Sequence, residues 1–192
     1  MRNLVILSFA LFTLTISSCK KDTPNNPGSG SNNLYIKFTL DGTPVDYEST
    51  SCSINTGFGG GSYTSSGFFD TEKDISIGIN IPQDTIRGAD LTALIGQKIE
   101  FYGCGGCPTN ADMIYSVGLG GDDYRTDQSL NTLPNQYLKL NTVTFSKTIN
   151  SFGKNVGQYI VTGEFNANLN YGSTIKSATN GTFKLVFQEA YN

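Results

Sequence analysis

The sequence contains no histidine and no tryptophan. Without imidazole there is no Ser-His-Asp or Cys-His catalysis and no His-ligated zinc site of the usual kinds, so most hydrolase mechanisms are excluded. The lack of tryptophan weakens the case for a sugar-stacking platform. It does not remove that case, because 10 tyrosines and 12 phenylalanines still offer aromatic faces.

Charge is also scarce. Charged side chains make up 15% of the residues, against about a quarter in an ordinary globular domain. The 13 basic and 16 acidic side chains are scattered along the chain, so no basic stripe is available to steer a phosphate backbone. We therefore expect no nucleic-acid partner. The 22 glycines indicate a turn-rich chain of strands.

An apolar run near the N-terminus is too short to span a membrane. It extends from Leu4 to Ile16, about 13 residues, whereas a spanning helix needs roughly 20. The positively charged Arg2 precedes it. A basic start followed by an apolar core of this length is typical of a signal peptide.

The end of this segment, Leu14 to Cys19 (LTISSC), places two serines directly before a cysteine, the side chain whose thiolate a lipid donor can alkylate. It resembles a bacterial lipoprotein signal. That resemblance implies cleavage before Cys19, a diacylglycerol on its sulfur and a fatty acid such as palmitate on its new amine. Three chains would anchor the protein stably, since one chain anchors only marginally. The alternative is an ordinary signal peptide with a chance cysteine.

Three segments follow from this interpretation: a signal peptide over 1–18, a lipidated cysteine and flexible tether over 19–33, and a β-sandwich domain over 34–192. The tether contains TPNNPGSGSNN, which has no apolar residue. A dozen such residues behave as a coil and would hold the domain roughly 20 Å from the bilayer.

Period-two alternation marks the strands. It is clearest over 34–40 and 75–81 and in the C-terminal third, over 143–149, 161–169 and 183–187, whereas 50–69 supports at most two weak strands. Asp41-Gly42 predicts a hairpin turn and Asn180-Gly181 a bulge or tight turn. One helical turn is expected between Asp90 as N-cap and Gly96. We predict an all-β, antiparallel two-sheet sandwich, immunoglobulin-like or jelly-roll-like.

The C-terminal third also carries a second resemblance, on TVTFSKTIN, YIVTGEFNANL and FKLVF between Val143 and Phe187, together with FTLDGTPVDY near the start of the domain. These stretches look like a family of β-sandwich lipoproteins of unknown function from Bacteroidota. The resemblance implies an outer-membrane lipoprotein. A short acidic run after the lipid cysteine directs that group to the cell surface. Lys20-Lys21-Asp22 supplies one acid, so the surface and periplasmic faces both stay open.

Three cysteines remain in the mature chain: Cys52, Cys104 and Cys107. Cys104 and Cys107 have redox spacing, but no helix follows them to lower a thiol pKa. Zinc would need a carboxylate or water as its fourth ligand, since histidine is absent. We favour a structural disulfide, either between Cys104 and Cys107 or from one of them to Cys52, because an exported protein meets an oxidising compartment.

Two further stretches have a possible role. Asp122, Asp123 and Asp127 could offer oxygen ligands to calcium, but they lack EF-hand spacing and a solvated turn explains them more simply. Asp84-Thr85-Ile86 is similar to the short O-glycosylation motif of Bacteroidota, which makes Thr85 a candidate for modification. We expect no metal site and no cofactor.

A pair of carboxylates on a sugar bond is the one hydrolytic mechanism that needs no histidine. Glu100, Glu164 and Glu189 lie on or near predicted strands, and Glu164 points outward with Asn166 and Asn168. A polar outer face is the ordinary solvent side of an antiparallel sheet, so we assign no catalytic residue.

The sequence thus predicts a lipid-anchored envelope protein, held at the outer membrane through Cys19, that acts as a non-enzymatic binding or accessory module for a glycan or a protein. One alternative is a carboxylate-dependent glycoside hydrolase. Another is a purely structural envelope protein.

Overall fold

Alternating apolar residues form strands throughout the part of the chain that the structure describes. The computed structural model describes residues 33–58, 61–69, 73–101, 108–117, 122–126, 135–151 and 153–191. Residues 32–192 form one compact unit. The elements are β1 (Leu34–Leu40), β2 (Thr43–Ser49), β3 (Ser53–Phe58), β4 (Ser62–Phe69), β5 (Lys73–Ile81), β6 (Thr85–Ile86), α1 (Gly88–Ala93), β7 (Lys98–Ile99), β8 (Asn110–Val117), β9 (Asp123–Arg125), β10 (Tyr137–Ser151), β11 (Lys154–Tyr171), β12 (Thr174–Gln188) and β13 (Ala190–Tyr191).

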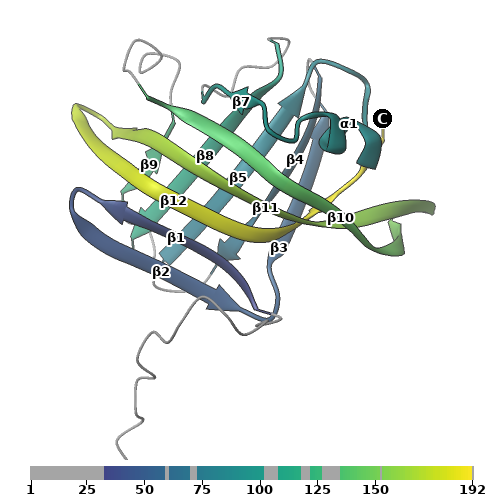
Figure 1. Ribbon diagram of the computed structural model, residues 1–192, viewed down its shortest axis with the longest axis horizontal. Helices are drawn as coiled ribbons and strands as arrows, with labels where there is room; N and C mark the ends of the chain where they lie inside the picture. Colours follow the sequence, from purple (N-terminus) through teal and green to yellow (C-terminus); the bar gives the residue numbers. More distant parts are fainter. Residues whose placement is uncertain are drawn as a thin grey trace, which may run out of the picture. The chain divides into compact units, whose positions relative to one another are not determined.

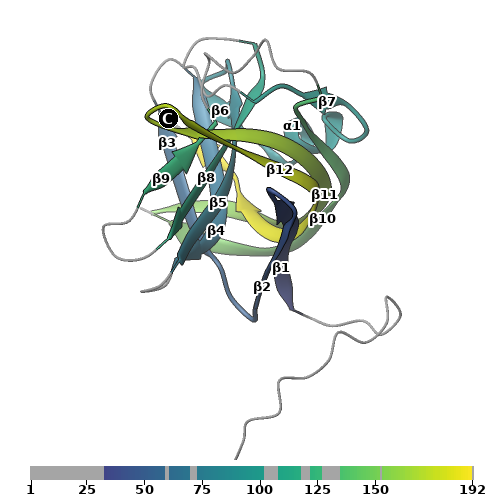
Figure 2. The same ribbon diagram turned by 90° about the vertical axis from the view of Figure 1, so that its left-hand side faces the viewer.

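One large antiparallel sheet folds into two facing layers. The first layer has the order β2-β1-β12-β11-β10, with β7 on the outer side of β10, and the second has the order β9-β8-β5-β4-β3. The layers are joined where β9 pairs with β11, through Asn170 and Arg125. Their strands cross, as Figure 1 shows, and Figure 2 shows the space that the layers enclose. A small sheet of β6 and β13 lies apart from this path. The prediction of an all-β antiparallel sandwich is confirmed.

The core fills the space between the layers. Ile75, Ile77 and Ile79 of β5 are fully buried, and they belong to one continuous cluster with Phe183 and Phe187 of β12. Burying a side chain of this size stabilises the folded state by about 1.5–3 kcal/mol. The residues that alternate with these isoleucines on β5 are polar or small: Asp74, Ser76, Gly78 and Asn80.

The two predicted turn signals are confirmed. Asp41 and Gly42 both have positive φ, 48° and 85°, which is the backbone of a tight hairpin turn. The Asp41 carboxylate also accepts a hydrogen bond of 2.8 Å from the backbone N–H of Ser177. Asn180 has φ 55°, and the register of β12 shifts beside it against both β1 and β11. This bulge opens the outer face of the first layer.

The predicted helix begins earlier than expected. Arg87, not Asp90, is the N-cap of α1, and Asp90 lies in the first turn, where its carboxylate accepts a hydrogen bond of 2.8 Å from the Arg87 backbone N–H. An aspartate suits both positions, because it can accept from a free N–H group at either. No helix in the described ranges is long and apolar enough to cross a membrane.

The region from 50 to 69 forms two regular strands, β3 and β4, which pair over six residues without a register shift. The sequence indicated weak strands there because serine, threonine and glycine have little side chain to bury. Phe145, in the predicted strand over 143–149, is 57% exposed. It contacts Tyr159 edge to face, with ring centroids 5.7 Å apart.

Candidate functional site

A polar groove is hollowed into the outer face of the first layer. Its volume is about 400 Å³, and we call it the amide groove because its walls carry Gln136, Asn166, Asn168 and Asn180, with Tyr137 at one side. The remaining lining residues are equally neutral: Asn135, Ala167, Ser177, Ala178 and Thr179. Among the described lining residues there is no carboxylate, lysine or arginine, so this lining suits a neutral polar ligand better than a phosphate or a charged peptide.

The groove lies at a single bulge in β12. Between the pairs Phe165–Gly181 and Ala167–Ala178, β12 contains one residue more than β11, and Asn180 there has a positive φ. The Asn166 side-chain oxygen accepts a hydrogen bond of 2.9 Å from the backbone N–H of Asn180. This hydrogen bond fixes the distance between β11 and β12 at the bulge, so the shape of the groove is defined by a specific contact.

A second contact fixes the side of the groove formed by β10. The Gln136 side-chain oxygen accepts a hydrogen bond of 3.0 Å from the backbone N–H of Asn168. The Lys98 ammonium lies 4.6 Å from the centroid of the Tyr137 ring, which restrains that ring beside the amides. Two side-chain amide oxygens thus hold the backbone, and the Asn166 amide nitrogen has no hydrogen-bond partner among the described residues.

Sequence reasoning found only part of this site. It placed Asn166 and Asn168 on the outer face but missed Gln136, Tyr137 and Asn180. The one available signal was Asn180-Gly181, which predicted a bulge without indicating which strand it would face.

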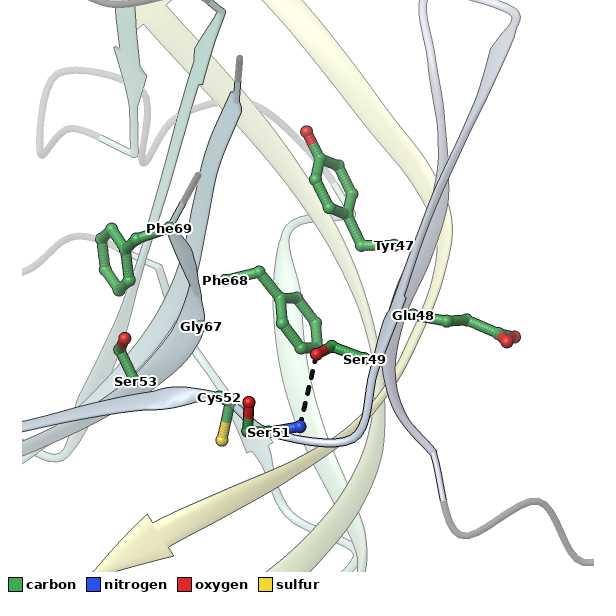
Figure 3. A pocket seen from close by; sticks show the side chains of 9 residues that line it. All are labelled: Tyr47, Glu48, Ser49, Ser51, Cys52, Ser53, Gly67, Phe68 and Phe69. Carbon is green, nitrogen blue, oxygen red and sulfur yellow. Dashed lines mark hydrogen bonds between the residues drawn. The ribbon is translucent and has the colours of Figure 1, made fainter. Parts of the chain in front are cut away.

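A second depression lies where β2 leads into β3, and Figure 3 shows its lining. It measures about 320 Å³. The Tyr47 and Phe68 rings lie nearly parallel with centroids 6.2 Å apart, and Phe69 is 48% exposed. The Glu48 side chain points away from it in Figure 3 and pairs with Lys37 instead. This junction pocket therefore offers aromatic walls and serine hydroxyls with no charged group aimed inward.

Cys52 lies beside this pocket as a free, half-buried thiol. The Ser66 hydroxyl donates a hydrogen bond to its sulfur over 3.1 Å, and the Val186 carbonyl oxygen lies 4.0 Å from that sulfur. The structure therefore does not contain the predicted bridge from Cys52. Cys104 and Cys107 lie outside the described residues, and the prediction that they pair with each other stays open.

The carboxylates considered for hydrolysis either form contacts with other side chains or lie too far from one another to act as a pair. Glu164 forms an ion pair of 3.2 Å with Lys139 on the outer face of the first layer. Glu189 lies beside Gly157, seven residues from Glu164 along β11, which corresponds to about 23 Å at 3.3 Å per residue. A glycosidase pair needs carboxyl groups about 5 to 10 Å apart. Glu100 is exposed just beyond β7.

Glu189 instead ties the C-terminus to the rest of the fold. Its carboxylate accepts hydrogen bonds from the backbone N–H groups of Gly88 (3.0 Å) and Gly157 (2.8 Å) and from the hydroxyls of Tyr159 (3.0 Å) and Tyr191 (2.7 Å). Burial alone would raise the pKa of Glu189, but these donors outweigh it and hold the pKa below its usual value. This role is structural.

The acidic turn shows no metal cluster among the residues that are described, which include Asp122 and Asp123 but not Asp127. The Asp123 carboxylate accepts hydrogen bonds from the Ser116 hydroxyl and from Arg125, and these lower the pKa of Asp123. Asp122 is exposed.

Thr85, the candidate for glycosylation, is half-buried in β6, where it pairs with Tyr191. The preceding Asp84 is exposed.

A further carboxylate, Asp112, was not singled out from the sequence. It lies on the outer face of the second layer, where it accepts hydrogen bonds of 3.3 and 3.4 Å from the Tyr63 hydroxyl, above Gly78. Desolvation raises the pKa of Asp112, and it raises the pKa of Tyr63 to about 12.

Comparisons with protein-family models, with curated proteins and with solved structures gave no match.

Proposed function

We propose that this protein is a lipid-anchored, non-enzymatic binding module of the cell envelope that holds a neutral glycan in the amide groove. The observation that carries the proposal is the neutral lining itself, in which several side-chain amides and one tyrosine converge on one depression. A protein partner, the other ligand class that the sequence left open, would favour a flatter and more apolar surface.

The lining has the chemistry that a sugar needs. An amide presents a donor and an acceptor side by side, so Asn168 can bond two neighbouring hydroxyls of one sugar ring. The Tyr137 hydroxyl can either donate or accept a hydrogen bond. Each such bond contributes about 0.5–1.5 kcal/mol net. A groove this shallow therefore supports weak binding to each sugar, and a repeating glycan or many anchored copies would increase the avidity.

Three observations support a non-enzymatic role. Glu164 is engaged by Lys139, Glu189 is engaged by four donors, and no histidine is available as a base. We expect no hydrolysis of glycans or peptides. Turnover that Glu164→Gln abolishes would establish the hydrolase alternative instead.

The anchor rests on the Leu14 to Cys19 stretch and on the resemblance to Bacteroidota lipoproteins. We propose attachment to the outer membrane through a lipid on Cys19. Cys19→Ala should release the domain from the membrane fraction or stall its processing. Unchanged partitioning of the variant into the detergent phase would refute the lipid anchor.

The glycan proposal is tested on the compact unit, residues 32–192, by titration with neutral oligosaccharides followed by NMR shift perturbation. Asn168→Ala is the cleanest variant, because Gln136 bonds the Asn168 backbone and leaves its side chain for the ligand. We expect at least a tenfold loss of affinity. Asn155→Ala, an exposed asparagine on the β10–β11 hairpin, is the matched control. The proposal fails if no neutral glycan shifts the groove resonances, or if both variants bind equally.

A further inference from the structure

The second layer ends in a bare edge at β3. Among the described strands, β3 pairs with β4 alone, through six consecutive pairs and no bulge. Its outer side therefore presents a straight row of backbone N–H and C=O groups. Such a row is a template for another strand unless something covers or guards it.

The other edge strands of the main sheet, as far as the structure describes it, are guarded. β2 carries Pro44, Asp46 and Glu48, and proline and charge both discourage pairing with a new strand. β10 is interrupted by two register shifts and is partly covered by β7. β3 has none of these protections, because its sequence SINTGF contains no charge and no proline.

The inward side of β3 is also incompletely covered. Ile54 and Thr56 point toward the core side of the layer, in register with Ser66 and Thr64 of β4. Ile54 is only half-buried and Thr56 is exposed. A strand placed beside β3 would cover both side chains and complete the layer.

We propose that a second copy of this protein supplies that strand, and that the two β3 strands pair antiparallel about a two-fold axis at Asn55. In this register Asn55 faces the partner's Asn55, Ile54 faces the partner's Thr56, and Ser53 faces the partner's Gly57. Directly opposed residues in an antiparallel pair share a face, so inward residues meet inward ones and outward residues meet outward ones. The pairing is self-complementary, as a two-fold interface requires.

Charge and geometry favour a second copy over a different extended peptide. Nothing charged lies on either strand to repel its equivalent. The aligned Ile54 and Thr56 form a β-branched pair of the kind that stabilises sheets. Among its described strands each copy has one such edge, and a two-fold pairing uses that edge on both copies, so the assembly closes as a dimer and does not grow into a fibre.

The dimer is expected to be weak. A six-residue edge buries less than the roughly 1,000 Å² that lasting complexes need, so we expect dissociation in the high micromolar range. Copies confined to one surface would meet at a much higher effective concentration.

The test is sedimentation velocity on residues 32–192 over a concentration series, with hydrogen exchange at β3. We expect a concentration-dependent dimer in which the β3 amides that point away from β4 gain protection. Asn55→Asp and Asn55→Lys each place like charges at the two-fold axis and should remain monomeric, whereas an equimolar mixture of the two should associate again. Thr43→Asp, on the exposed β2 edge, should dimerise as the native protein does.

Three results would overturn the proposal. The native unit could stay monomeric up to about 1 mM, a concentration at which a dimer with a high-micromolar dissociation constant would be substantially populated. The Asn55 variants could associate unchanged, which would place the contact elsewhere. The β3 amides that point away from β4 could already be protected in dilute monomer, which would mean that another segment of the same chain covers the edge.

Discussion

Replacing Glu189 should destabilise the domain, because its carboxylate holds the C-terminal end of the described chain to the rest of the fold. The two buried glycines, Gly88 and Gly157, donate backbone N–H groups to its carboxylate, and the two tyrosine hydroxyls do the same. Leaving a buried donor without an acceptor costs about 1–3 kcal/mol, whereas the half-buried tyrosines can bond water. Because Glu189 is itself half-buried and water can enter, we expect Glu189→Ala to destabilise the domain by about 2–4 kcal/mol.

The assay is thermal unfolding followed by circular dichroism. For a domain of this size each kcal/mol shifts Tm by about 2–4 °C, so the expected fall is about 5–15 °C. Glu100→Ala is the matched control, because Glu100 is exposed and its change should shift Tm by less than about 2 °C. Equal Tm values for the two variants would refute the reasoning.

The pH dependence gives a second check on the same residue. Because the pKa of Glu189 is lower in the folded state than in the unfolded state, its contribution is fully present above the unfolded value near 4.5 and is lost as pH falls through the folded value. The stability difference between the native protein and Glu189→Gln should therefore shrink below about pH 4.5. A difference that stays constant down to pH 3 would mean that the carboxylate charge plays no part.

The remaining predictions concern the second layer. Gly78→Ala should destabilise the domain by about 1–3 kcal/mol in urea unfolding, because the added Cβ would lie 2.5 Å from the Tyr63 hydroxyl oxygen and closer still to Asp112. Gly57→Ala is the matched control, since its Cβ would meet only an ordinary contact. Asp112→Asn should stabilise the domain at pH 7 and lose that advantage at acid pH, since burial raises the pKa of Asp112 and penalises its ionised form. Mass spectrometry without reduction should find Cys52 as a free thiol, and a bridge from Cys52 would contradict the structure.

Local features of the fold were predictable from the sequence. The alternation through Ile75 to Ile81 predicts which side of β5 is buried without any knowledge of the neighbouring strands. The dipeptide Asp41-Gly42 is sufficient to predict the hairpin turn that it forms. The start of α1 was misplaced at Asp90, since the same residue serves as an N-cap or in the first turn. These successes and this error depend on a few adjacent residues.

The sites depend on strand register, which local patterns do not determine. The outward position of Asn166 followed from alternation, but its contact with Asn180 requires the bulge of β12 to lie opposite that residue of β11. Glu189 meets Gly88, which is 101 positions away in the chain. Pairing over such distances is set by the whole core, so the amide groove and the Glu189 contacts could not have been located from residue spacing.

The pairing of β1 with β12 also constrains how the chain folds. β1 opens the folded domain, yet its partner on the side away from β2 is the last long strand, so Ile36 meets Phe183 across almost the whole chain. The β1–β2 hairpin can form early but cannot dock until the final strand has emerged. High contact order of this kind slows folding to about milliseconds to seconds. Until β12 has been synthesised, β1 therefore has β2 as a neighbour but lacks the strand that flanks it on the other side in the folded sheet.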